Sequence, residues 1–340
     1  MKARFYCRFI SFLALALVFC LPAARAELAV YFLDVGQSDC AVAVCDGEVL
    51  MIDGGSSDQS RFIYSFLHKT LQANHLKYVI ATHPHEDHIG GLAAAISTCA
   101  IGTIYSPVST YSDCYPFEAL KRCGEDQHLT LTPPPIGQSV MLGSAKVTFL
   151  GPLRDTDDPN ALSIVCRIDY GKTSFLFTGD MTADEENDLL ESGAALGATV
   201  LKVPHHGSDS SSCESFLRAV SPQIAVISVG EGNDYGHPSR DTITRLAVCG
   251  SAIYRTDIHG TVLCVSDKEK VTVTCEKSDR AHTGDPSEYT GKYIGNRNSL
   301  KLHLADCDSV AKMKEKNKVF FDTRGAAIAQ GFTPCQLCNP

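Results

Sequence analysis

The chain has 340 residues, of which 44% are hydrophobic, and its formal net charge is −9 at pH 7. A chain of this length and apolar content can bury a large core and still form a small second unit. The acidic balance excludes a protein that coats nucleic acid over its whole surface. The charge is unevenly placed, because from Gly291 onward eight Lys or Arg face only four Asp or Glu, a net of +4.

The first 26 residues have the pattern of a secretory signal. A basic start is followed by an apolar run of about 12 residues and by an A-R-A site that ends at Ala26. The run is too short for a comfortable membrane span, and no other stretch is long and apolar enough. We expect cleavage after Ala26 and a secreted or periplasmic protein.

Fifteen cysteines are present, and 13 remain once Cys7 and Cys20 leave with the signal. An oxidising compartment permits disulfides among them, although sequence alone does not fix the pairing. The odd number indicates that some cysteines have another role. The candidates for pairing are Cys99, Cys114 and Cys123 around one loop, and Cys264 with Cys275 on neighbouring strands.

The first half of the main body predicts strands before helices. Residues 29–55 alternate short apolar runs with D-G and G-G turns, which indicates three strands in a meander that ends at Asp53-Gly54-Gly55. Helical spacing follows over 59–76, then a buried strand at 78–82 and a helix at 91–97. Residues 107–137 are rich in Tyr, Cys and Pro, and we expect a long loop that faces the substrate.

The second half repeats this order. Two strands around a Y-G-K turn end at Asp180, and a helix at 182–192 and a strand at 199–203 follow. Helices at 212–219 and 239–248 precede the closing strands. Strands followed by alternating strands and helices, twice over, predict an α/β fold, a four-layered αββα sandwich.

Three boundaries follow from composition. The sandwich should span residues 27–275. Residues 276–292 are polar, contain Gly and Pro and show no apolar period, which is typical of a linker. Residues 293–340 then form a separate small unit.

The stretch T-H-P-H-E-D-H-I-G-G at 82–91 places His83, His85, Asp87 and His88 within six positions. It lies between a predicted strand and a predicted helix, where such side chains can converge on one or two ions. Imidazole together with carboxylate suits Zn²⁺, and less exclusively Mn²⁺ or Fe. A solvated histidine-rich loop is the alternative, but the proline and paired glycines that fix the turn argue against it.

Further polar side chains each follow a predicted strand: Asp180, the pair His205 and His206, and His237. Strand ends at one edge of a sandwich can assemble a site from distant parts of the sequence. Taken singly, these residues are also compatible with a turn aspartate, a surface pair and a loop histidine. Their occurrence together with the first motif favours one shared site.

These motifs resemble a known family. H-P-H-E-D-H matches the H-x-H-x-D-H signature of the metallo-β-lactamase superfamily. The later motifs, N-A-L-S-I-V, F-T-G-D, L-K-V-P-H-H-G-S, Y-G-H-P-S and Y-R-T-D-I-H-G-T, follow in the order of the extracellular ComEC-type competence domain. The resemblance covers roughly residues 27–275 and implies an αββα metallohydrolase with two zinc ions, manganese being an alternative.

The resemblance also implies a ligand set in which each ion has its own residues and one carboxylate is shared. The implied ligands are His83 and His85 for the first ion, Asp87 and His88 for the second, and Asp180 as the bridge.

One of His205 and His206 would complete the first site, and His237 would complete the second. Which member of the pair is a ligand stays open, and the other is a candidate proton donor or phosphate contact. The pattern departs from the wider superfamily between His88 and Asp180. The only histidine there is His128, in the variable loop, and the region holds Asn160 and Ser163 instead.

The expected chemistry is hydrolysis. A water that bridges two ions is hydroxide at neutral pH, and the ions also bind the oxyanion and the leaving oxygen. Proton transfer by Asp87 or a spare histidine of the His205–His206 pair makes these three the candidate catalytic residues.

Three expectations concern residues around the ligands. Asp53 and Asp34, at strand ends, are expected to orient ligand imidazoles, with ordinary turn aspartates as the alternative. Gly207 and Ser208 are expected to offer backbone N–H groups to a phosphate.

The C-terminal unit holds His303-x₃-Cys307 and Cys335-x₂-Cys338. Four N and S ligands at this spacing are typical of a tetrahedral structural zinc, which a unit this small needs. The unit resembles the Ada-type metal-binding domain, with His303 in place of that family's first cysteine. A disulfide between Cys335 and Cys338, or with Cys307, is the alternative that a secreted location allows.

Lys312, Lys314, Lys316, Lys318 and Arg324 give the unit a basic face. A solvated helix is the alternative interpretation, but the Ada-type resemblance favours contact with DNA phosphates.

The sequence therefore predicts a secreted metal-dependent phosphodiesterase that acts on DNA and holds it with a basic zinc module. A hydrolase of small phosphodiesters or other esters is a second hypothesis. A catalytically inactive DNA-binding or uptake accessory is a third, which the complete ligand set disfavours.

Overall fold

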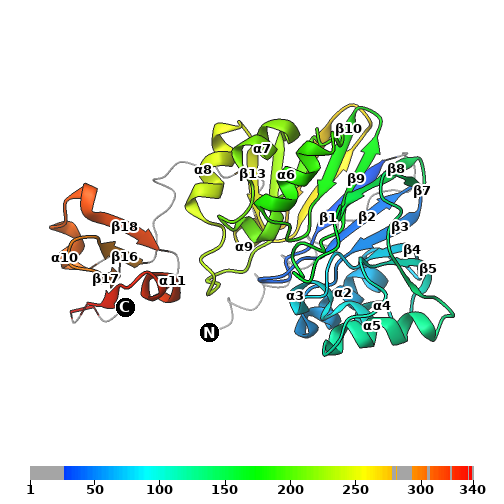
Figure 1. Cartoon of the computed structure of the whole chain (residues 1–340), viewed down its shortest axis with the longest axis horizontal. Coiled ribbons are helices and arrows are strands. Elements are labelled where there is room, and N and C mark those ends of the chain that lie inside the picture. The colour runs from blue at the N-terminus through cyan, green and yellow to red at the C-terminus, as the bar shows by residue number, and fades with distance from the viewer. Residues whose placement is uncertain are drawn as a thin grey trace, which may run out of the picture.

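The computed structural model of the chain describes residues 27–277, 281, 293–304, 307–321, 324–335 and 337–338 (Figure 1). The expected signal and most of the expected linker lie outside the described residues. Within those ranges, no helix combines the length and the apolar character that crossing a membrane requires.

The first sheet has eight strands in the order β15-β14-β1-β2-β3-β4-β5-β6. Neighbours pair antiparallel from β15 to β3 and parallel from β3 to β6. The predicted meander forms its centre. Its strands are β1 (Leu28–Phe32), β2 (Ala41–Cys45), β3 (Glu48–Ile52), β4 (His75–Ile80), β5 (Ala100–Tyr105), β6 (Leu131–Thr132), β14 (Val262–Ser266) and β15 (Val271–Cys275).

The second sheet has seven strands in the order β13-β12-β11-β10-β9-β8-β7. The four strands from β10 to β13 are parallel, whereas β7 to β10 form antiparallel pairs. Its strands are β7 (Ser139–Leu142), β8 (Ala145–Gly151), β9 (Val165–Tyr170), β10 (Thr173–Phe177), β11 (Val200–Lys202), β12 (Ile224–Ile227) and β13 (Ala252–Arg255).

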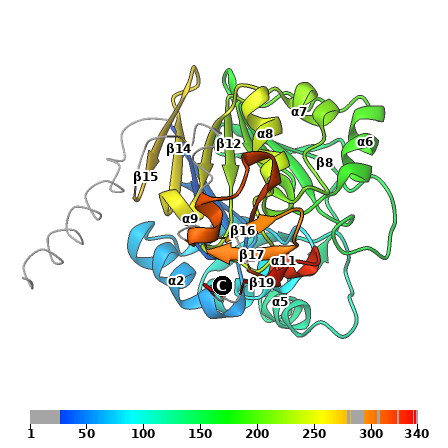
Figure 2. The ribbon, with the colours of Figure 1, turned by 90° about the vertical axis from the view of Figure 1, so that its left-hand side faces the viewer.

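Helices cover the outer face of each sheet, as Figures 1 and 2 show from two directions. The helices of the first half are α2 (Ser60–Ser65), continued by a π-helical turn (Phe66–Thr70), α3 (Glu86–Ile89), α4 (Leu92–Ile96) and α5 (Tyr115–Glu125). Those of the second half are α6 (Ala183–Glu191), α7 (Glu214–Val220), α8 (Arg240–Val248) and α9 (Thr256–His259). Short 3₁₀ turns occur at Ser57–Gln59 and Pro204–Gly207.

Strand β1 shows how the layers pack. Leu28, Val30 and Phe32 belong to the core between the two sheets, whereas Ala29 and Tyr31 pack on the helix side. Successive side chains of a strand point to opposite faces, so a strand that is apolar throughout is buried on both faces. A third apolar core lies between the second sheet and α6, α7 and α8. The predicted αββα sandwich is confirmed.

The expectation of a long loop over 107–137 is wrong. Helix α5 occupies its middle, with Pro116 in the first turn, a position that proline favours. The buried side of α5 is formed by Phe117, Leu120 and Gly124, which are spaced for one face of a helix. The Tyr- and Cys-rich flanks obscure this short period in the sequence.

The C-terminal unit contains a separate four-stranded sheet in the order β18-β16-β17-β19. Small apolar clusters lie on it, one built around Ile294, Val310 and Met313 and the other around Leu302 and Phe321. The elements are β16 (Tyr293–Asn296), β17 (Lys301–Leu304), α10 (Asp308–Ala311), a 3₁₀ turn (Glu315–Asn317), β18 (Lys318–Phe321), α11 (Arg324–Ala329) and β19 (Thr333–Pro334).

Candidate metal centre

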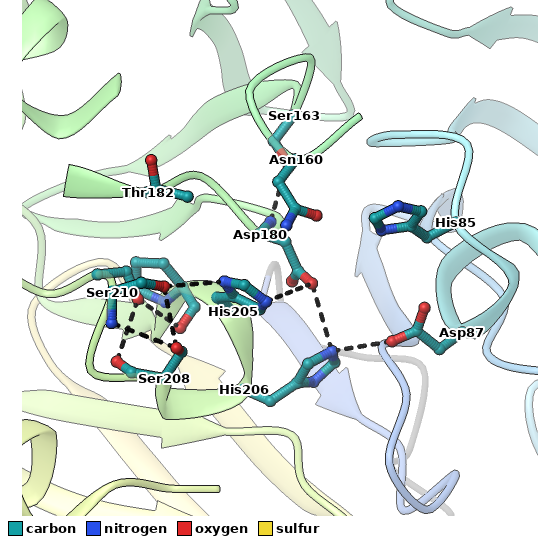
Figure 3. Close-up of polar contacts among 12 residues, drawn as sticks. His85, Asp87, Asn160, Ser163, Asp180, Thr182, His205, His206, Ser208 and Ser210 are labelled. Carbon is teal, nitrogen blue, oxygen red and sulfur yellow. Dashed lines mark hydrogen bonds and ion pairs between the residues drawn. The ribbon is translucent and has the colours of Figure 1, made fainter. Parts of the chain in front are cut away.

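The candidate site forms where strands of both sheets end. In the first sheet β4 leads into His83, and in the second sheet the neighbouring parallel strands β10 and β11 lead into Asp180 and His205–His206. Parallel strands bring their carboxyl ends to the same edge, which is where such sheets place ligands. In Figure 3, His85 and Asp87 approach from one side and Asp180, His205 and His206 from the other.

Four side chains form the Asp87 group: Asp87, His88, Asp180 and His206. One ligand atom from each lies within 4.8 Å of all the others. The Asp180 Oδ1 atom lies 3.2 Å from His88 Nε2, and the His206 Nε2 atom lies 3.2 Å from Asp87 Oδ2. A second distance of 3.5 Å joins His206 Nε2 to Asp180 Oδ2. These residues come from three separate segments of the chain and meet at one point.

Hydrogen bonds orient the two imidazoles of the group. His88 Nδ1 donates to Asp53 Oδ2 at 2.8 Å, and His206 Nδ1 donates to the Ser228 carbonyl oxygen at 2.9 Å. Each ring therefore keeps its proton on Nδ1 and turns an Nε2 lone pair towards the shared point. The role expected for Asp53 is confirmed, and Thr82 holds this carboxylate through its N–H and its hydroxyl.

The donor set fits a divalent cation. His88 Nε2 and Asp180 Oδ1 are buried, and neither has a hydrogen-bond partner among the described residues. Buried polar atoms are costly when unpartnered, so their convergence with two more ligand atoms indicates a bound ion. Two imidazoles and two carboxylates are ligands that Zn²⁺ accepts.

Electrostatic interactions within the Asp87 group shift the pKa values of its carboxylates and imidazoles. Burial raises the pKa of Asp180, but the nearby His88 and His206 rings outweigh it and hold that pKa well below its ordinary value. Burial lowers the pKa of His88, yet Asp180 and Asp53 raise it well above the ordinary histidine value. The site therefore favours ionised carboxylates beside positive charge, and a cation bound by the four ligand atoms would supply that charge in place of the second proton on His88.

His83, His85 and His205 are further histidines near Asp180, outside the four-atom group. His83 Nε2 and His205 Nε2 each lie 3.9 Å from Asp180 Oδ2, and His85 Nδ1 lies 3.1 Å from His83 Nε2. Asp180 thus faces both groups of histidines, as a bridging carboxylate must.

The expected division of the ligands between two ions stays a prediction. His206 Nε2 lies 3.2 Å from Asp87 Oδ2, beside the residues expected for the second ion, and both His205 Nε2 and His206 Nε2 face Asp180 Oδ2, at 3.9 and 3.5 Å. His237 is not part of the four-atom group: its ring packs beside His205 at a centroid distance of 5.7 Å. Burial, together with His206 and His205, lowers the pKa of His237 to about 4.

An open polar cleft of about 300 Å³ gives access to these residues. Besides the ligand residues it is lined by Gln37, Glu86, Asn160 and Tyr235.

Tyr235 is 72% exposed, and its ring stacks on His237 with an interplanar angle of 24°. Asn233 holds this loop, because its side chain bonds the backbone N–H groups of Tyr235 and His237 and the His237 carbonyl. No residue of the 107–137 segment lines the cleft.

The His205–His206 turn has an unusual backbone. Both residues have positive φ values, 51° and 52°, which is uncommon for residues with a side chain and typical of functional sites. Gly207 follows at φ +82°, and a Cβ atom there would come within 2.6 Å of Pro238 Cβ. The glycine lets the two histidine-bearing loops approach each other.

The C-terminal unit brings together a second candidate metal site. One ligand atom from each of His303, Cys307, Cys335 and Cys338 lies within 4.8 Å of the others. Backbone N–H groups of Leu304 and Leu337 donate to Cys338 Sγ and Cys335 Sγ, both at 3.4 Å. All 13 cysteines of the described residues are free thiols, so the alternative of a disulfide within this unit is not observed. Three thiols and an imidazole suit a tetrahedral zinc ion.

Comparison with known proteins identifies the larger unit. Residues 33–231, more than half of the chain, match the family model of the metallo-beta-lactamase superfamily. The chain belongs to this superfamily. Residues 285–340 match the metal binding domain of Ada. Both expected resemblances are confirmed.

Two curated relatives are competence proteins. The metallo-beta-lactamase chain is 26% identical over 266 residues to ComE operon protein 3 of Bacillus subtilis (72% of this chain, 34% of that protein). It is 30% identical over 238 residues to competence protein ComA of Neisseria gonorrhoeae (69% and 32%). The chain therefore spans about a third of the length of these relatives.

Further matches include a recombination protein and a solved structure. Recombination protein 2 of Haemophilus influenzae is 28% identical over 236 residues, covering 68% of this chain and 28% of that protein. Among solved structures, the metallo-beta-lactamase fold protein YhfI from Bacillus subtilis aligns with a TM-score of 0.49 and 14% identity, over 71% of this chain and all of that chain.

Two expectations about neighbouring residues of this metallo-beta-lactamase site are wrong. Asp34 does not orient a ligand histidine, because its carboxylate pairs with Lys277 at 3.2 Å. The Ser208 N–H is not free for a phosphate, since it donates to the His205 carbonyl at 2.8 Å. Both residues were inferred from position in sequence, which does not show where a loop turns.

The sequence interpretation also missed two residues, Asp39 and Lys202. They form a buried ion pair beneath the Asp87 group. The lysine in L-K-V-P-H-H was the available signal, because a charged residue inside an apolar strand needs a partner.

Proposed function

We propose that this chain is a secreted metal-dependent phosphodiesterase that cleaves DNA, with two zinc or manganese ions in the cleft. Membership of the metallo-beta-lactamase superfamily supports a metal-dependent hydrolase. The observation that carries the proposal is the Asp87 group, in which four ligand atoms converge and two of them are buried without hydrogen-bond partners.

The proposed ligands form two sets that share Asp180. His88, His206 and Asp87 would hold one ion, and His83, His85 and His205 would hold the other. Bound ions of this kind supply a hydroxide at neutral pH and neutralise the charge that develops on a phosphate. His237 is close to His205 and would take part only if its loop adjusts.

The residues of the cleft have separate tasks in this proposal. Asp53 and the Ser228 carbonyl keep the ligand rings oriented, so that little reorganisation is needed during the reaction. His205 is partly exposed and lines the cleft, and its Nδ1 lies 3.3 Å from Ser210 Oγ, a contact that orients the ring with Nε2 towards Asp180. Gln37 and Asn160 offer amide groups to the phosphate oxygens.

Three observations support DNA as the substrate. The cleft is open and polar, and the exposed Tyr235 offers a ring face on which a base can stack. The relatives carry the names competence protein and recombination protein. The C-terminal segment has a net charge of +4, whereas the chain as a whole has −9.

The C-terminal unit would hold one structural zinc ion through its His303, Cys307, Cys335 and Cys338 ligands. It would bind DNA phosphates through its basic residues, of which Lys312, Lys314 and Lys316 are exposed. The basic C-terminal unit would thereby bind DNA and raise its concentration near the acidic catalytic domain. For the proposed secretion, the mature protein recovered from the medium or the periplasm should begin at Glu27.

The test compares two substrates. Plasmid DNA and bis-p-nitrophenyl phosphate are incubated with the mature protein, with Zn²⁺ or Mn²⁺ added or with EDTA present. We expect metal-dependent cleavage of both, lost in Asp87→Ala and retained in Asp34→Ala. The second variant is the matched control, since Asp34 also follows a strand but pairs with Lys277 outside the site.

Other outcomes would change the assignment. Hydrolysis of the small ester without DNA cleavage would support a small-phosphodiester enzyme. DNA binding without either activity would support an inactive binding or uptake accessory. Activity that survives in Asp87→Ala would show that the Asp87 group is not the catalytic centre.

A further inference from the structure

A buried charge pair joins the two sheets beneath the candidate centre. Lys202 Nζ lies 2.7 Å from Asp39 Oδ2, and the two side chains are only 4% and 7% exposed. Lys202 ends β11 in the second sheet, and Asp39 lies in the loop between β1 and β2 of the first sheet. The ammonium group also donates to the Val203 carbonyl at 2.9 Å.

Such a pair is an inefficient way to stabilise a core. Removing two charges from water costs about as much as their attraction returns, and apolar residues of similar size often do as well or better. The surrounding cavity is small, and its lining combines apolar residues such as Ala41, Ile52 and Phe177 with the polar Asp53, Thr82 and Ser228. The pair is therefore better explained by what it touches than by the stability that it adds.

Asp39 contacts both ligands that face each other in the Asp87 group. Its Oδ1 atom lies 3.5 Å from His206 Nδ1, and its backbone N–H donates to the Asp87 carbonyl at 3.1 Å. Those two ligands are themselves only 3.2 Å apart, from His206 Nε2 to Asp87 Oδ2. A ligand atom of Asp39 also lies within 4.8 Å of those of Asp53 and His88.

Lys202 contacts Asp39 from the second sheet. It ends the strand that leads through Val203 and Pro204 into the strained His205–His206 turn. Its ammonium binds one carboxylate oxygen of Asp39 and so leaves the other, Oδ1, directed at the His206 ring. Asp39 Oδ1 has no hydrogen-bond partner among the described residues and lies 3.5 Å from His206 Nδ1, whose N–H donates to the Ser228 carbonyl, so the contact of Asp39 with this ring is electrostatic.

We propose that Asp39 and Lys202 are positioning residues that set the metal affinity of the Asp87 group. The pair fixes His206, from the second sheet, relative to Asp87, from the first. This inference rests on the proposed metal centre, and it assigns no contact with substrate to either residue.

The test uses three variants of the full chain: Asp39→Asn, Lys202→Met and the double variant. Thermal unfolding reports stability, and competition with a chromophoric chelator reports zinc affinity at a temperature where each variant is folded. Each single variant leaves a buried charge unpaired and should unfold at a lower temperature. The double variant should regain much of that stability but should still bind zinc at the Asp87 group about 10- to 100-fold more weakly than the wild type.

The double variant Arg167→Met/Asp169→Asn is the matched control. It removes a partly buried ion pair on β9, in which Arg167 and Asp169 lie 2.8 Å apart outside the Asp87 group, and it should leave zinc affinity unchanged. A folded Asp39→Asn/Lys202→Met protein with wild-type zinc affinity would overturn the inference. If instead the wild type binds zinc only through its C-terminal cysteines, the metal centre itself is wrong, so the two failures are distinguishable.

Discussion

Asp180 is the residue on which the two halves of the site depend. Its Oδ1 faces His88, and its Oδ2 lies within 3.9 Å of His83, His205 and His206. No other carboxylate of the described residues contacts both groups of histidines. The bridging role that the motif order implied is therefore compatible with the observed geometry.

We expect Asp180→Asn to lower DNA cleavage by about 10³-fold, because the amide keeps the size of the side chain but loses the charge that balances two cations. The measurement is the initial rate of plasmid relaxation at saturating Mn²⁺. Thermal unfolding serves as the check on folding. A rate within a factor of ten of the wild type would contradict a bridging role.

Tyr235 should determine affinity for DNA and not the chemical step. Loss of a stacked base costs about 1–3 kcal/mol, so Tyr235→Ala should raise KM for a single-stranded oligonucleotide about tenfold or more and leave kcat nearly unchanged. Tyr235→Phe, which keeps the ring, is the control. An oligonucleotide with abasic sites should show little difference between wild type and Tyr235→Ala. Equal KM values on the intact strand would exclude stacking.

Residue types and their order predicted most of the candidate ligands, because each functional side chain follows a strand that is recognisable from its apolar run. The sequence interpretation missed Asp39 and Lys202. Their role depends on a contact between the two sheets, and the two residues are 163 positions apart in the chain. The roles given to Asp34 and Ser208 were wrong for the same reason: a strand end fixes a region of the fold, whereas a partner depends on the path of the loop.

At the scale of elements, the turn after β11 combines backbone strain with close packing. Gly207→Ala should destabilise the protein by about 1–3 kcal/mol, since it adds a Cβ in the left-handed region and a contact of 2.6 Å with Pro238. The melting temperature should fall by several degrees. Gly193→Ala is the matched control, because Gly193 has φ +70° with no atom within 4 Å of the added Cβ. Equal melting temperatures for the two variants would show that packing against Pro238 is unimportant.

Elements with long apolar patterns were predictable, and elements with short ones were not. The helices at 182–192 and 239–248 correspond to α6 and α8 within one residue at each end. Helix α5 was missed because only Phe117, Leu120 and Gly124 mark its buried face. Helix α9, which has only four residues between two strands, offers no period at all.

At the scale of the molecule, the opposite charges of the two units predict a division of labour. Deletion of 291–340 should weaken DNA binding about tenfold or more and flatten its dependence on salt, because fewer phosphate contacts release fewer counterions. Turnover of bis-p-nitrophenyl phosphate should not change. The triple variant Lys312→Glu/Lys314→Glu/Lys316→Glu is the control, since it keeps the zinc ligands and removes the charge. Unchanged DNA affinity in both proteins would refute the role given to the unit.

The measurement that tests the central claim most directly is the zinc stoichiometry of the full chain by native mass spectrometry, with DNA cleavage assayed on the same samples. We predict three zinc ions in the wild type, two in the cleft and one in the C-terminal unit. Asp180→Asn should lose the cleft ions together with DNA cleavage and retain the third. A wild-type chain that carries a single zinc ion and still cleaves DNA in the presence of EDTA would contradict the account.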